Sequence, residues 1–341
     1  MLDLVSMIAA DQRRWDDIPL LPTIFATSEP AKIAHFIDDF CRTHLSSAPI
    51  KTEFFAPSVG AVFGLCLSDG RRVVVKAHSS SHEAEFLRAV SQVQRYLVDQ
   101  GYPCPRPILG PLPLCLGLAT VEELVDEGAY GEPHDPAICR SLADLLVQLV
   151  NLLRNPSAIP GIQAAVFDQH PLPPGVLWSV PHNAIFDFAA TATGAEWIDD
   201  LARPASETLA SGAGELVLGH TDWSVKHVRY VAGKARVIYD WDSLARMKEP
   251  AMVGSAAMNF TYNEWGAPAR PTCDEARAFV SAYETARGAS FTPEEYRTLQ
   301  ASVTYRLAYG SRCEHSLNPT QTVYPADSCR ALLACYGENF L

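Results

Sequence analysis

The stretch that decides the fold is GHTDWSVKHVRYVAGKARVIYDWDSL, residues 219–244. Within it, VRYVAG (228–233) and ARVIYD (235–240) are short apolar runs that meet at a glycine-containing turn, which predicts a β-hairpin. The hairpin brings Asp222, which precedes it, close to Asp240, which ends it. Two converging carboxylates suit a magnesium–nucleotide site, where one orients and deprotonates a hydroxyl and the other holds the metal that bridges the phosphates.

At these residues the chain resembles the aminoglycoside phosphotransferase family, the small-molecule branch of the protein-kinase-like fold. That family carries a His-Gly-Asp loop with an asparagine five residues after the aspartate, then an Asp-x-Asp or Asp-x-Glu motif after a hairpin. This chain has His220 and Asp222 in the first motif, and Asp240 and Asp242 in the second. The resemblance implies that Asp222 is the catalytic residue and that Asp240, helped by Asp242, binds magnesium.

The chain departs from the family pattern at two positions. Thr221 replaces the glycine, which is a mild change, and His227 stands where the family has its asparagine. An imidazole nitrogen is a poorer ligand for magnesium than an amide oxygen. Either His227 hydrogen-bonds a phosphate or the catalytic aspartate, or the second metal site is weakened or lost. The neighbouring Lys226 would add positive charge at the γ-phosphate, and His220 is expected to brace the turn through the backbone.

The upstream half predicts the lysine strand that a kinase-like protein needs. Strand-like runs at 61–67 and 72–77 flank Ser68-Asp69-Gly70, a good hairpin turn. Lys76 ends the second run, so its ammonium would emerge from a buried strand and bind the nucleotide phosphates. A lysine at a strand end is more often a solvated edge charge. The preceding hairpin and the acidic helix that follows favour the functional interpretation.

The helix predicted at 80–101 would supply the carboxylate that positions the lysine. Glu83 and Glu85 both lie in its first turns, where the helix dipole alone would favour an acid. Glu85 is the expected partner of the lysine, with Glu83 as the close alternative. The loop that covers the phosphates is expected at Ser58 and Gly60, between the first two strands.

The segment LATVEELVDEG (118–128) reads as a strand that leads into a polar linker. By resemblance it is the hinge between two lobes, where adenine pairs with the backbone. The Glu123 carbonyl and the Val125 amide are the expected partners.

The resemblance implies an α+β, two-lobed protein-kinase-like fold, with a small antiparallel sheet in the N-terminal lobe and a larger, mainly helical C-terminal lobe. The expected domains are an N-terminal helical extension at 1–48, a nucleotide-binding lobe at 49–124, and a helical lobe at 125–341. The last would carry the catalytic loop, the metal motif and the acceptor pocket. A length of 341 residues permits two lobes.

Composition favours a cytoplasmic globular enzyme. Hydrophobic residues make up 48% and charged residues 19%, which excludes a disordered chain. The nine cysteines show no paired metal-ligand spacing and are expected to be reduced. A net charge of −12 argues against nucleic acid as partner, and no apolar run approaches the length of a membrane span.

The C-terminal half is predicted to be mainly helical. Apolar spacing predicts a core helix at 136–154, and Thr292 begins another as an N-cap followed by proline and two acids. The proline-rich segment 155–181 reads as a long loop that could overhang the acceptor. The Cys313-Glu314-His315 run invites a metal interpretation, but no second pair accompanies it, so structural use is favoured.

The expected function is transfer of the γ-phosphate of ATP, with Mg²⁺, to a hydroxyl of a small molecule. Aminoglycosides or other amino-sugar antibiotics are candidate acceptors, and antibiotic resistance and a metabolic role both stay open. The expected assembly is a monomer or a homodimer. Two alternatives remain: a nucleotide-binding protein with little or no transferase activity, suggested by His227, and a metallohydrolase that uses the acidic cluster. The second leaves Lys76 and its hairpin without a role.

Overall fold

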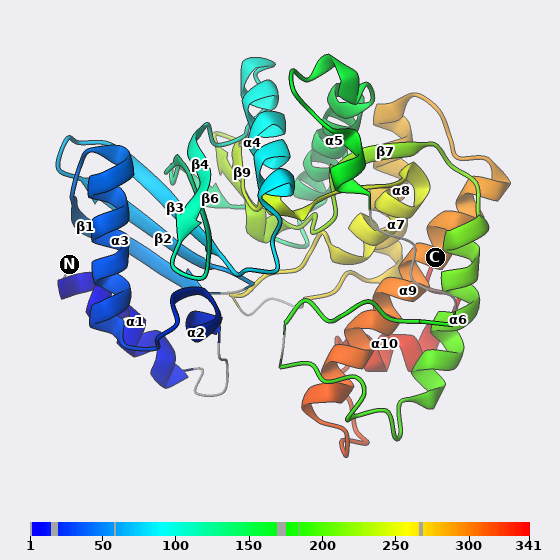
Figure 1. Cartoon of the computed structure of the whole chain (residues 1–341). Helices are drawn as coiled ribbons and strands as arrows, with labels where there is room; N and C mark the ends of the chain where they lie inside the picture. The colour runs from blue at the N-terminus through cyan, green and yellow to red at the C-terminus, as the bar shows by residue number, and fades with distance from the viewer. Residues whose placement is uncertain (1, 15–19, 58, 169–174, 184, 266–268) are drawn as a thin grey trace. The chain divides into compact units, whose positions relative to one another are not determined.

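The computed structural model describes residues 2–14, 20–57, 59–168, 175–183, 185–265 and 269–341. The chain divides into two compact units (Figure 1). Unit 1 consists of Met1–Asp126, Ile159–Val166 and His182–Ile185. Unit 2 consists of Glu127–Ala158, Phe167–Pro181 and Phe186–Leu341. The chain first leaves unit 1 for unit 2 after Asp126, just beyond the strand that was predicted to lead into the hinge.

Unit 1 is built on a five-stranded antiparallel sheet. Its strands are, in spatial order, β1 (Pro49–Pro57), β2 (Ala61–Leu67), β3 (Arg72–His78), β5 (Gly117–Glu123) and β4 (Pro107–Leu114). The predicted hairpin at 61–77 is confirmed as β2 and β3, which turn at Gly70 with a positive φ of 87°. The expected lysine strand is therefore central in the sheet, with β2 on one side and β5 on the other.

The two faces of this sheet have different roles because side chains alternate along a strand. Phe63, Val75 and Val121 lie on one face and share a buried core with helices α1 (Leu2–Arg14), α2 (Leu20–Phe25) and α3 (Pro30–Leu45). The three helices that the structure describes within residues 1–48, predicted as an N-terminal extension, therefore contribute to the core of unit 1. The opposite face carries Lys76 and Glu122.

Helix α4 (Ala84–Asp99) of unit 1 confirms the helix predicted after the lysine strand. It buries Leu87, Val90, Val93 and Leu97 at helical spacing, and its chain continues through Gly101, which has a positive φ of 76°.

Unit 2 is mainly helical, as predicted. Its helices are α5 (Pro136–Leu153), α6 (Glu196–Ser211), α7 (Glu249–Asn259), α8 (Cys273–Arg287), α9 (Pro293–Leu317) and α10 (Cys329–Tyr336). Short 3₁₀ turns lie at Pro156–Ala158, Ala164–Phe167, Val225–His227 and Trp241–Ser243, of which the second falls mostly in unit 1. Helix α5 is long and apolar enough to cross a membrane by composition, but Leu142, Leu146 and Leu149 are fully buried in unit 2. It is a core helix here.

Two small sheets complete unit 2. Strands β7 (Leu216–His220) and β10 (Leu244–Lys248) pair antiparallel, and β6 (Ala129–Tyr130), β8 (Val228–Val231) and β9 (Lys234–Ile238) form the other sheet. The hairpin predicted from residues 228–240 is confirmed as β8 and β9. Both aspartate motifs follow directly from these strands, one after β7 and the other after β9.

Further features of the sequence have structural explanations. All nine cysteines are free thiols, as expected. Cys313, Glu314 and His315 lie in α9, where His315 contacts the Thr193 carbonyl at 3.2 Å and Glu314 accepts bonds from the backbone at the start of α10. Their contacts are structural, which agrees with the interpretation favoured from the sequence.

Candidate active site

The loop that follows β7 is anchored to two helices of unit 2. The indole of Trp223 is 1% exposed and donates to the Leu142 carbonyl of α5 at 3.1 Å. The Val225 amide donates to the Phe260 carbonyl, just after α7, at 2.8 Å. Because these bonds use buried donors on both sides of Ser224, the loop has a defined path. Asp222 therefore projects from a fixed backbone.

The two aspartate motifs are also tied to each other. The backbone amide and the hydroxyl of Thr221 both donate to the Ser243 carbonyl, at 2.9 and 2.8 Å. The hydroxyl of Thr221, where the family has glycine, thus has a structural use. The Tyr239 amide donates to the His227 carbonyl at 2.9 Å. The sequence prediction that the hairpin brings these motifs together agrees with this geometry.

His220 braces the same turn from a buried position. Its Nε2 lies 3.0 Å from the Tyr239 carbonyl, so this nitrogen must donate. The side chain is buried, and its Nδ1 atom has no hydrogen-bond partner among the described residues. Burial lowers the pKa of His220, which keeps the ring neutral. It is a bracing contact of the kind that the sequence favoured.

Both oxygens of the Asp222 carboxylate are held by hydrogen bonds. Asn259, the last residue of α7, donates its amide to Oδ1 at 2.8 Å, and Nε2 of His227 lies 3.0 Å from Oδ2. Arg270 in turn donates to the Asn259 side-chain oxygen at 3.0 Å. This bond fixes which way the Asn259 amide faces, because a guanidinium can only donate. The catalytic candidate is therefore immobilised from two directions.

Positive charge surrounds the same carboxylate. The ammonium of Lys226 lies 3.6 Å from Oδ2, and the guanidinium of Arg306 in α9 lies 3.6 Å from Oδ1. Burial would raise the pKa of Asp222, but the hydrogen bond from His227 and the charges of His227, Lys226 and Arg306 hold it well below its usual range. Asp222 is therefore ionised at any physiological pH.

Asp240 occupies an unusual backbone conformation. Its φ and ψ are 66° and 45°, in the left-handed region that non-glycine residues rarely adopt. The Ser243 hydroxyl donates to its Oδ2 at 2.8 Å, and the His227 ring lies 3.8 Å from the same atom. Strain of this kind is typical of residues placed for function. The turn aims the Asp240 carboxylate at the side chains of the catalytic loop.

Asp222, His227 and Asp240 fit a divalent cation. One ligand atom from each lies within 4.8 Å of the others. Two carboxylates are the hard oxygen donors that magnesium prefers, whereas the imidazole is a weaker ligand for it. His227 already contacts Asp222, as one of the two sequence interpretations expected. The two carboxylates present therefore fit a magnesium site.

In unit 1 the partner of the lysine differs from the prediction. The Lys76 ammonium lies 3.3 Å from Glu122, and both side chains are about a tenth exposed or less. In the register of β3 and β5, Lys76 pairs with Thr120, so Glu122 is its diagonal neighbour on the same face. Glu85 and Glu83 are exposed at the start of α4. The salt bridge with Glu122 replaces the expected one with Glu85.

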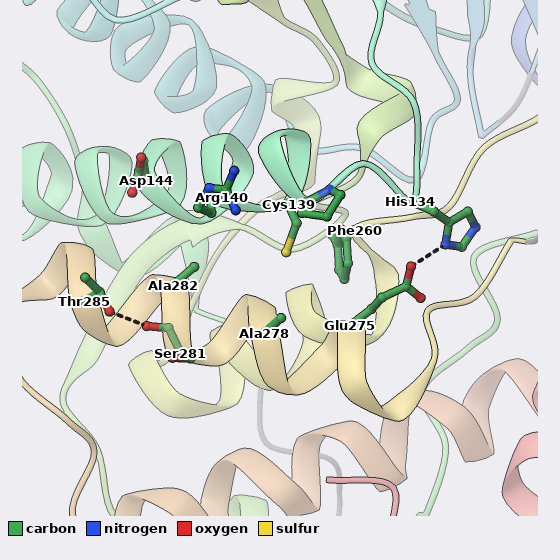
Figure 2. Close-up of a pocket in the computed structure, with 11 residues that line it drawn as sticks. His134, Cys139, Arg140, Asp144, Phe260, Glu275, Ala278, Ser281, Ala282 and Thr285 are labelled. Carbon is green, nitrogen blue, oxygen red and sulfur yellow. Dashed lines mark hydrogen bonds and ion pairs between the residues drawn. The ribbon is translucent and has the colours of Figure 1, made fainter.

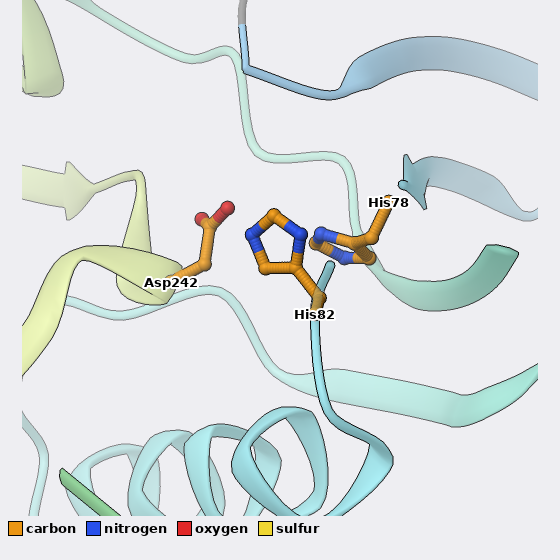
Figure 3. Close-up of side chains that lie close together, drawn as sticks. All are labelled: His78, His82 and Asp242. Atoms are coloured by element: carbon orange, nitrogen blue, oxygen red, sulfur yellow. The ribbon is translucent and has the colours of Figure 1, made fainter. Parts of the chain in front are cut away.

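Helix α4 still contributes to this pair through a different residue. Gln94 is buried and donates to the second oxygen of Glu122 at 2.8 Å. Gln94 and Glu85 are nine positions apart, which at about 100° per residue puts them on opposite sides of the helix. The residue of α4 that contacts the Lys76–Glu122 pair is therefore the polar residue on its buried side, Gln94. Nearby, the rings of His78 and His82 lie 5.1 Å apart (Figure 3).

The other predicted nucleotide-binding residues lie at strand ends of unit 1. Gly60 is in the loop between β1 and β2, where an added Cβ would meet the Ala77 carbonyl oxygen at 2.8 Å. Ser58 lies outside the described residues. Glu123 ends β5, with its amide bonded to the Arg106 carbonyl at 2.9 Å, and Val125 follows it. Their proposed contacts with the nucleotide stay predictions.

Sequence reasoning missed three residues around Asp222. Asn259 ends the run PAMVGSAAMN, residues 250–259, which is rich in small apolar residues. Apart from Ser255, it is the only polar side chain in that run. Arg270 and Arg306 lie far along the chain, and nothing in their local sequence distinguishes them. Asp242, predicted to assist with metal, lies in the turn after Asp240.

A separate cavity of about 540 Å³ lies in unit 2 between α5 and α8 (Figure 2). Its lining includes Arg140, Cys139 and the ion pair of His134 with Glu275 at 2.8 Å. Burial raises the pKa of Cys139 to about 11, so its thiol is protonated and unreactive. The lining contains none of the candidate catalytic residues described above.

Comparison with known proteins agrees with this geometry. The phosphotransferase enzyme family matches residues 65–297. Among solved structures, amicoumacin kinase hAmiN in complex with AMP-PNP, Ca²⁺ and Ami is similar with a TM-score of 0.63 and 13% identity, over 91% of this chain and 95% of that one. A putative aminoglycoside phosphotransferase from Ralstonia eutropha JMP134 has a TM-score of 0.57 and 12% identity, over 90% and 96%.

A third similar structure, the ethanolamine kinase of Plasmodium vivax, has a TM-score of 0.54 and 12% identity, over 89% of this chain and 88% of that one. Comparison with curated proteins gives no significant match. The solved structures confirm the kinase-like α+β fold expected from the sequence. The match to the family extends over most of the chain, from β2 to the start of α9. The chain therefore belongs to the phosphotransferase enzyme family.

Proposed function

We propose that the protein transfers the γ-phosphate of ATP to a hydroxyl group of a small molecule, with Asp222 as the residue that orients the hydroxyl and accepts its proton. The observation that carries the proposal is the Asp222 carboxylate itself. It is held by Asn259 and His227 and lies within metal-binding distance of Asp240. A purely structural carboxylate would not need an adjacent metal-binding partner on a strained turn.

The chemical step needs little basicity from the enzyme. The acceptor oxygen forms a bond to the γ-phosphorus while the bond from that phosphorus to the ADP oxygen breaks, and ADP leaves. In a loose transition state the hydroxyl proton moves late, so positioning matters more than base strength. A carboxylate with a strongly lowered pKa suits this role. The proton passes to Asp222 as the phosphoester forms.

Asp240 is the residue that best fits a magnesium ion, with Asp242 and His227 as further predicted contributors. A magnesium ion held there would neutralise charge on the phosphate oxygens. The ammonium of Lys226 adds a second positive charge beside Asp222, which compensates for the imidazole at the position of the family asparagine.

Unit 1 supplies the nucleotide-binding residues in this proposal. Lys76, held by Glu122 rather than by Glu85, neutralises the α- and β-phosphates, and Gly60 permits close approach of the backbone. Backbone groups of Glu123 and Val125 bind adenine. The protein acts in the cytoplasm as a monomer or homodimer.

The experiment is an ATP-consumption screen of the full chain over alcohols of different charge, with Mg²⁺. We expect ADP formation that depends on an acceptor and falls about 10²- to 10⁴-fold in Asp222→Asn, because the uncharged amide positions the hydroxyl less well and cannot take its proton late in the step. Unchanged turnover in Asp222→Asn would show that the central residue is misassigned. ATP binding without acceptor-dependent turnover would instead favour a nucleotide-binding protein without transferase activity, the alternative suggested by His227.

A further inference from the structure

Arg306 differs from Arg270, the other arginine near Asp222, because its guanidinium donates no hydrogen bond to a described residue. Its guanidinium lies 3.6 Å from Oδ1 of Asp222, which is an ion-pair contact but too long for a hydrogen bond. No hydrogen bond from Arg306 to another residue occurs in the described parts of the chain. The side chain is 32% exposed. Five N–H donors are therefore available at the edge of the catalytic carboxylate.

The neighbouring cations each contact more than one group. Lys226 is shared between Asp222 and Glu264, 3.7 Å away, and its ammonium lies 4.6 Å from the ring centre of Tyr262. Arg270 donates to Asn259 and packs on the same tyrosine ring. Glu264 is a second acid beside Lys226, which offsets its charge. Arg306 is therefore the cation best placed to receive an anion from outside.

The helix that carries Arg306 continues into an aromatic surface. Tyr305 precedes it in α9, and Tyr309 follows one turn later; their rings lie 5.3 and 6.2 Å from that of Trp178. The acid beside this surface, Asp199, is bound by the Trp178 indole at 2.9 Å and lies 3.4 Å from Arg312. Asp199 has little capacity left for a positively charged ligand. The surroundings of Arg306 on α9 are thus aromatic and basic.

We propose that Arg306 binds a carboxylate of the acceptor, placed one or two carbon atoms from the hydroxyl that Asp222 orients. The planar guanidinium fork matches a carboxylate with two parallel hydrogen bonds. Because Arg306 and Asp222 are 3.6 Å apart, one small hydroxy acid reaches both. The acceptor is then an anionic alcohol and differs in charge from an aminoglycoside. The inference rests on the proposed phosphotransferase function and specifies its acceptor class.

The test compares acceptors that differ only in charge. D- and L-glycerate, their carboxamides and the matching amino alcohols are assayed with the full chain, ATP and Mg²⁺. We expect kcat/KM to favour the acid over its amide in the wild type. In Arg306→Gln the KM for the acid should rise at least about tenfold, as expected for a lost charge-assisted pair, while the KM for ATP stays the same. Arg306→Lys keeps the charge without the fork and should be intermediate.

A binding measurement makes the result independent of turnover. Ligand-observed NMR records glycerate and glyceramide binding to the protein saturated with AMP-PNP and Mg²⁺. Preferential binding of glycerate that is lost in Arg306→Gln supports the proposal. Equal binding of acid and amide, or no binding of glycerate to the wild type, overturns it.

Two other outcomes of the kinetic test have separate meanings. A rise in the KM for ATP in Arg306→Gln would mean that the guanidinium binds the nucleotide phosphates, which also overturns the proposal. Turnover of neutral or cationic alcohols in preference to acids would refute the acceptor class and leave the phosphotransferase function intact. Failure of that function would appear as absence of ATP consumption with every acceptor, while the NMR result would still decide the role of Arg306.

Discussion

At the scale of single residues, the carboxylate of Asp222 is held by donors from two different elements. His227 occupies the position of the family asparagine, and an asparagine from another element, Asn259, contacts the same carboxylate. The two donors take one oxygen each. An amide near the reactive carboxylate is thus present in this chain, although it comes from the end of α7 instead of the loop.

Asn259→Ala should reduce kcat with little change in the KM for ATP. The bond from Asn259 joins a charged acceptor, and such bonds contribute about 1.5–3 kcal/mol, which corresponds to a loss of roughly 10- to 100-fold. Steady-state kinetics with the best acceptor from the screen measure the change. Arg270→Met should cause a smaller loss, because it frees the Asn259 amide without removing it. Equal kinetics in Asn259→Ala and the wild type would exclude a positioning role.

His220 should make folding stability depend on pH. Its pKa is lowered in the folded protein by burial, whereas in the unfolded chain it is about 6.5. The unfolded chain therefore binds a proton that the folded protein rejects. This contribution to stability is fully present above about pH 6.5 and is lost as the pH falls below it.

His220→Gln tests this prediction, because glutamine can still donate to the Tyr239 carbonyl but does not titrate. Urea unfolding at pH 8 and pH 5.5 gives the free energy of unfolding of both proteins. We expect the wild type to lose more stability than the variant between these pH values. Parallel losses in the two proteins would assign the pH dependence to other groups.

At the scale of secondary structure, the sequence predicted the elements better than the side-chain contacts between them. Hydrophobic periodicity and turn residues were enough for β2, β3, α4, α5 and the hairpin of β8 and β9. The partner of Lys76 was not predictable in this way. Glu122 and Gln94 meet through the register of β3 with β5 and the rotation of α4, and neither is encoded locally.

The same limit explains why Asn259 was missed. The run that ends in Asn259 has weak amphipathic character, because α7 is buried on nearly all sides. Its small residues predicted neither a helix nor a site. What links this helix to Asp222 is packing within unit 2, between residues 37 positions apart in the chain. Local motifs predicted the Asp222 carboxylate as a site residue, and only the fold shows what holds it.

Glu122→Gln should weaken ATP binding, and Glu85→Gln should not. Loss of the Glu122 charge removes the ion pair that holds the buried Lys76 ammonium in its observed position. We expect the KM for ATP to rise about tenfold, which corresponds to about 1.4 kcal/mol. Glu85 is exposed and on the other side of α4, so its variant is a matched control. A larger effect of Glu85→Gln would restore the partner predicted from the sequence.

At the scale of the whole molecule, the proposed nucleotide chemistry draws on residues of both units. Lys76 belongs to unit 1, whereas Asp222 and Asp240 belong to unit 2. The N-terminal helices take part in the core of unit 1, so the fold of that unit includes residues well before its first strand. Composition and length indicated two lobes, but they did not indicate that the N-terminal helices share a core with the sheet of unit 1.

Mg²⁺–ATP should stabilise the whole protein against unfolding. A ligand that binds only the folded state at a hundred times its Kd adds about 2.7 kcal/mol. We expect the melting temperature to rise with nucleotide concentration in the wild type. The rise should be much smaller in Lys76→Met, even where that variant alone melts near the wild type. An equal rise in Lys76→Met would remove Lys76 from the nucleotide site.

The left-handed backbone of Asp240 has a consequence for how this protein would respond to selection for heat tolerance. A non-glycine residue in that region costs roughly 1–2 kcal/mol. Asp240→Gly should therefore unfold at a higher temperature than the wild type in calorimetry, and should show no acceptor-dependent ADP formation. Lower thermal stability in this variant would mean that the carboxylate itself holds the turn. Selection for higher thermal stability at this position would therefore remove turnover.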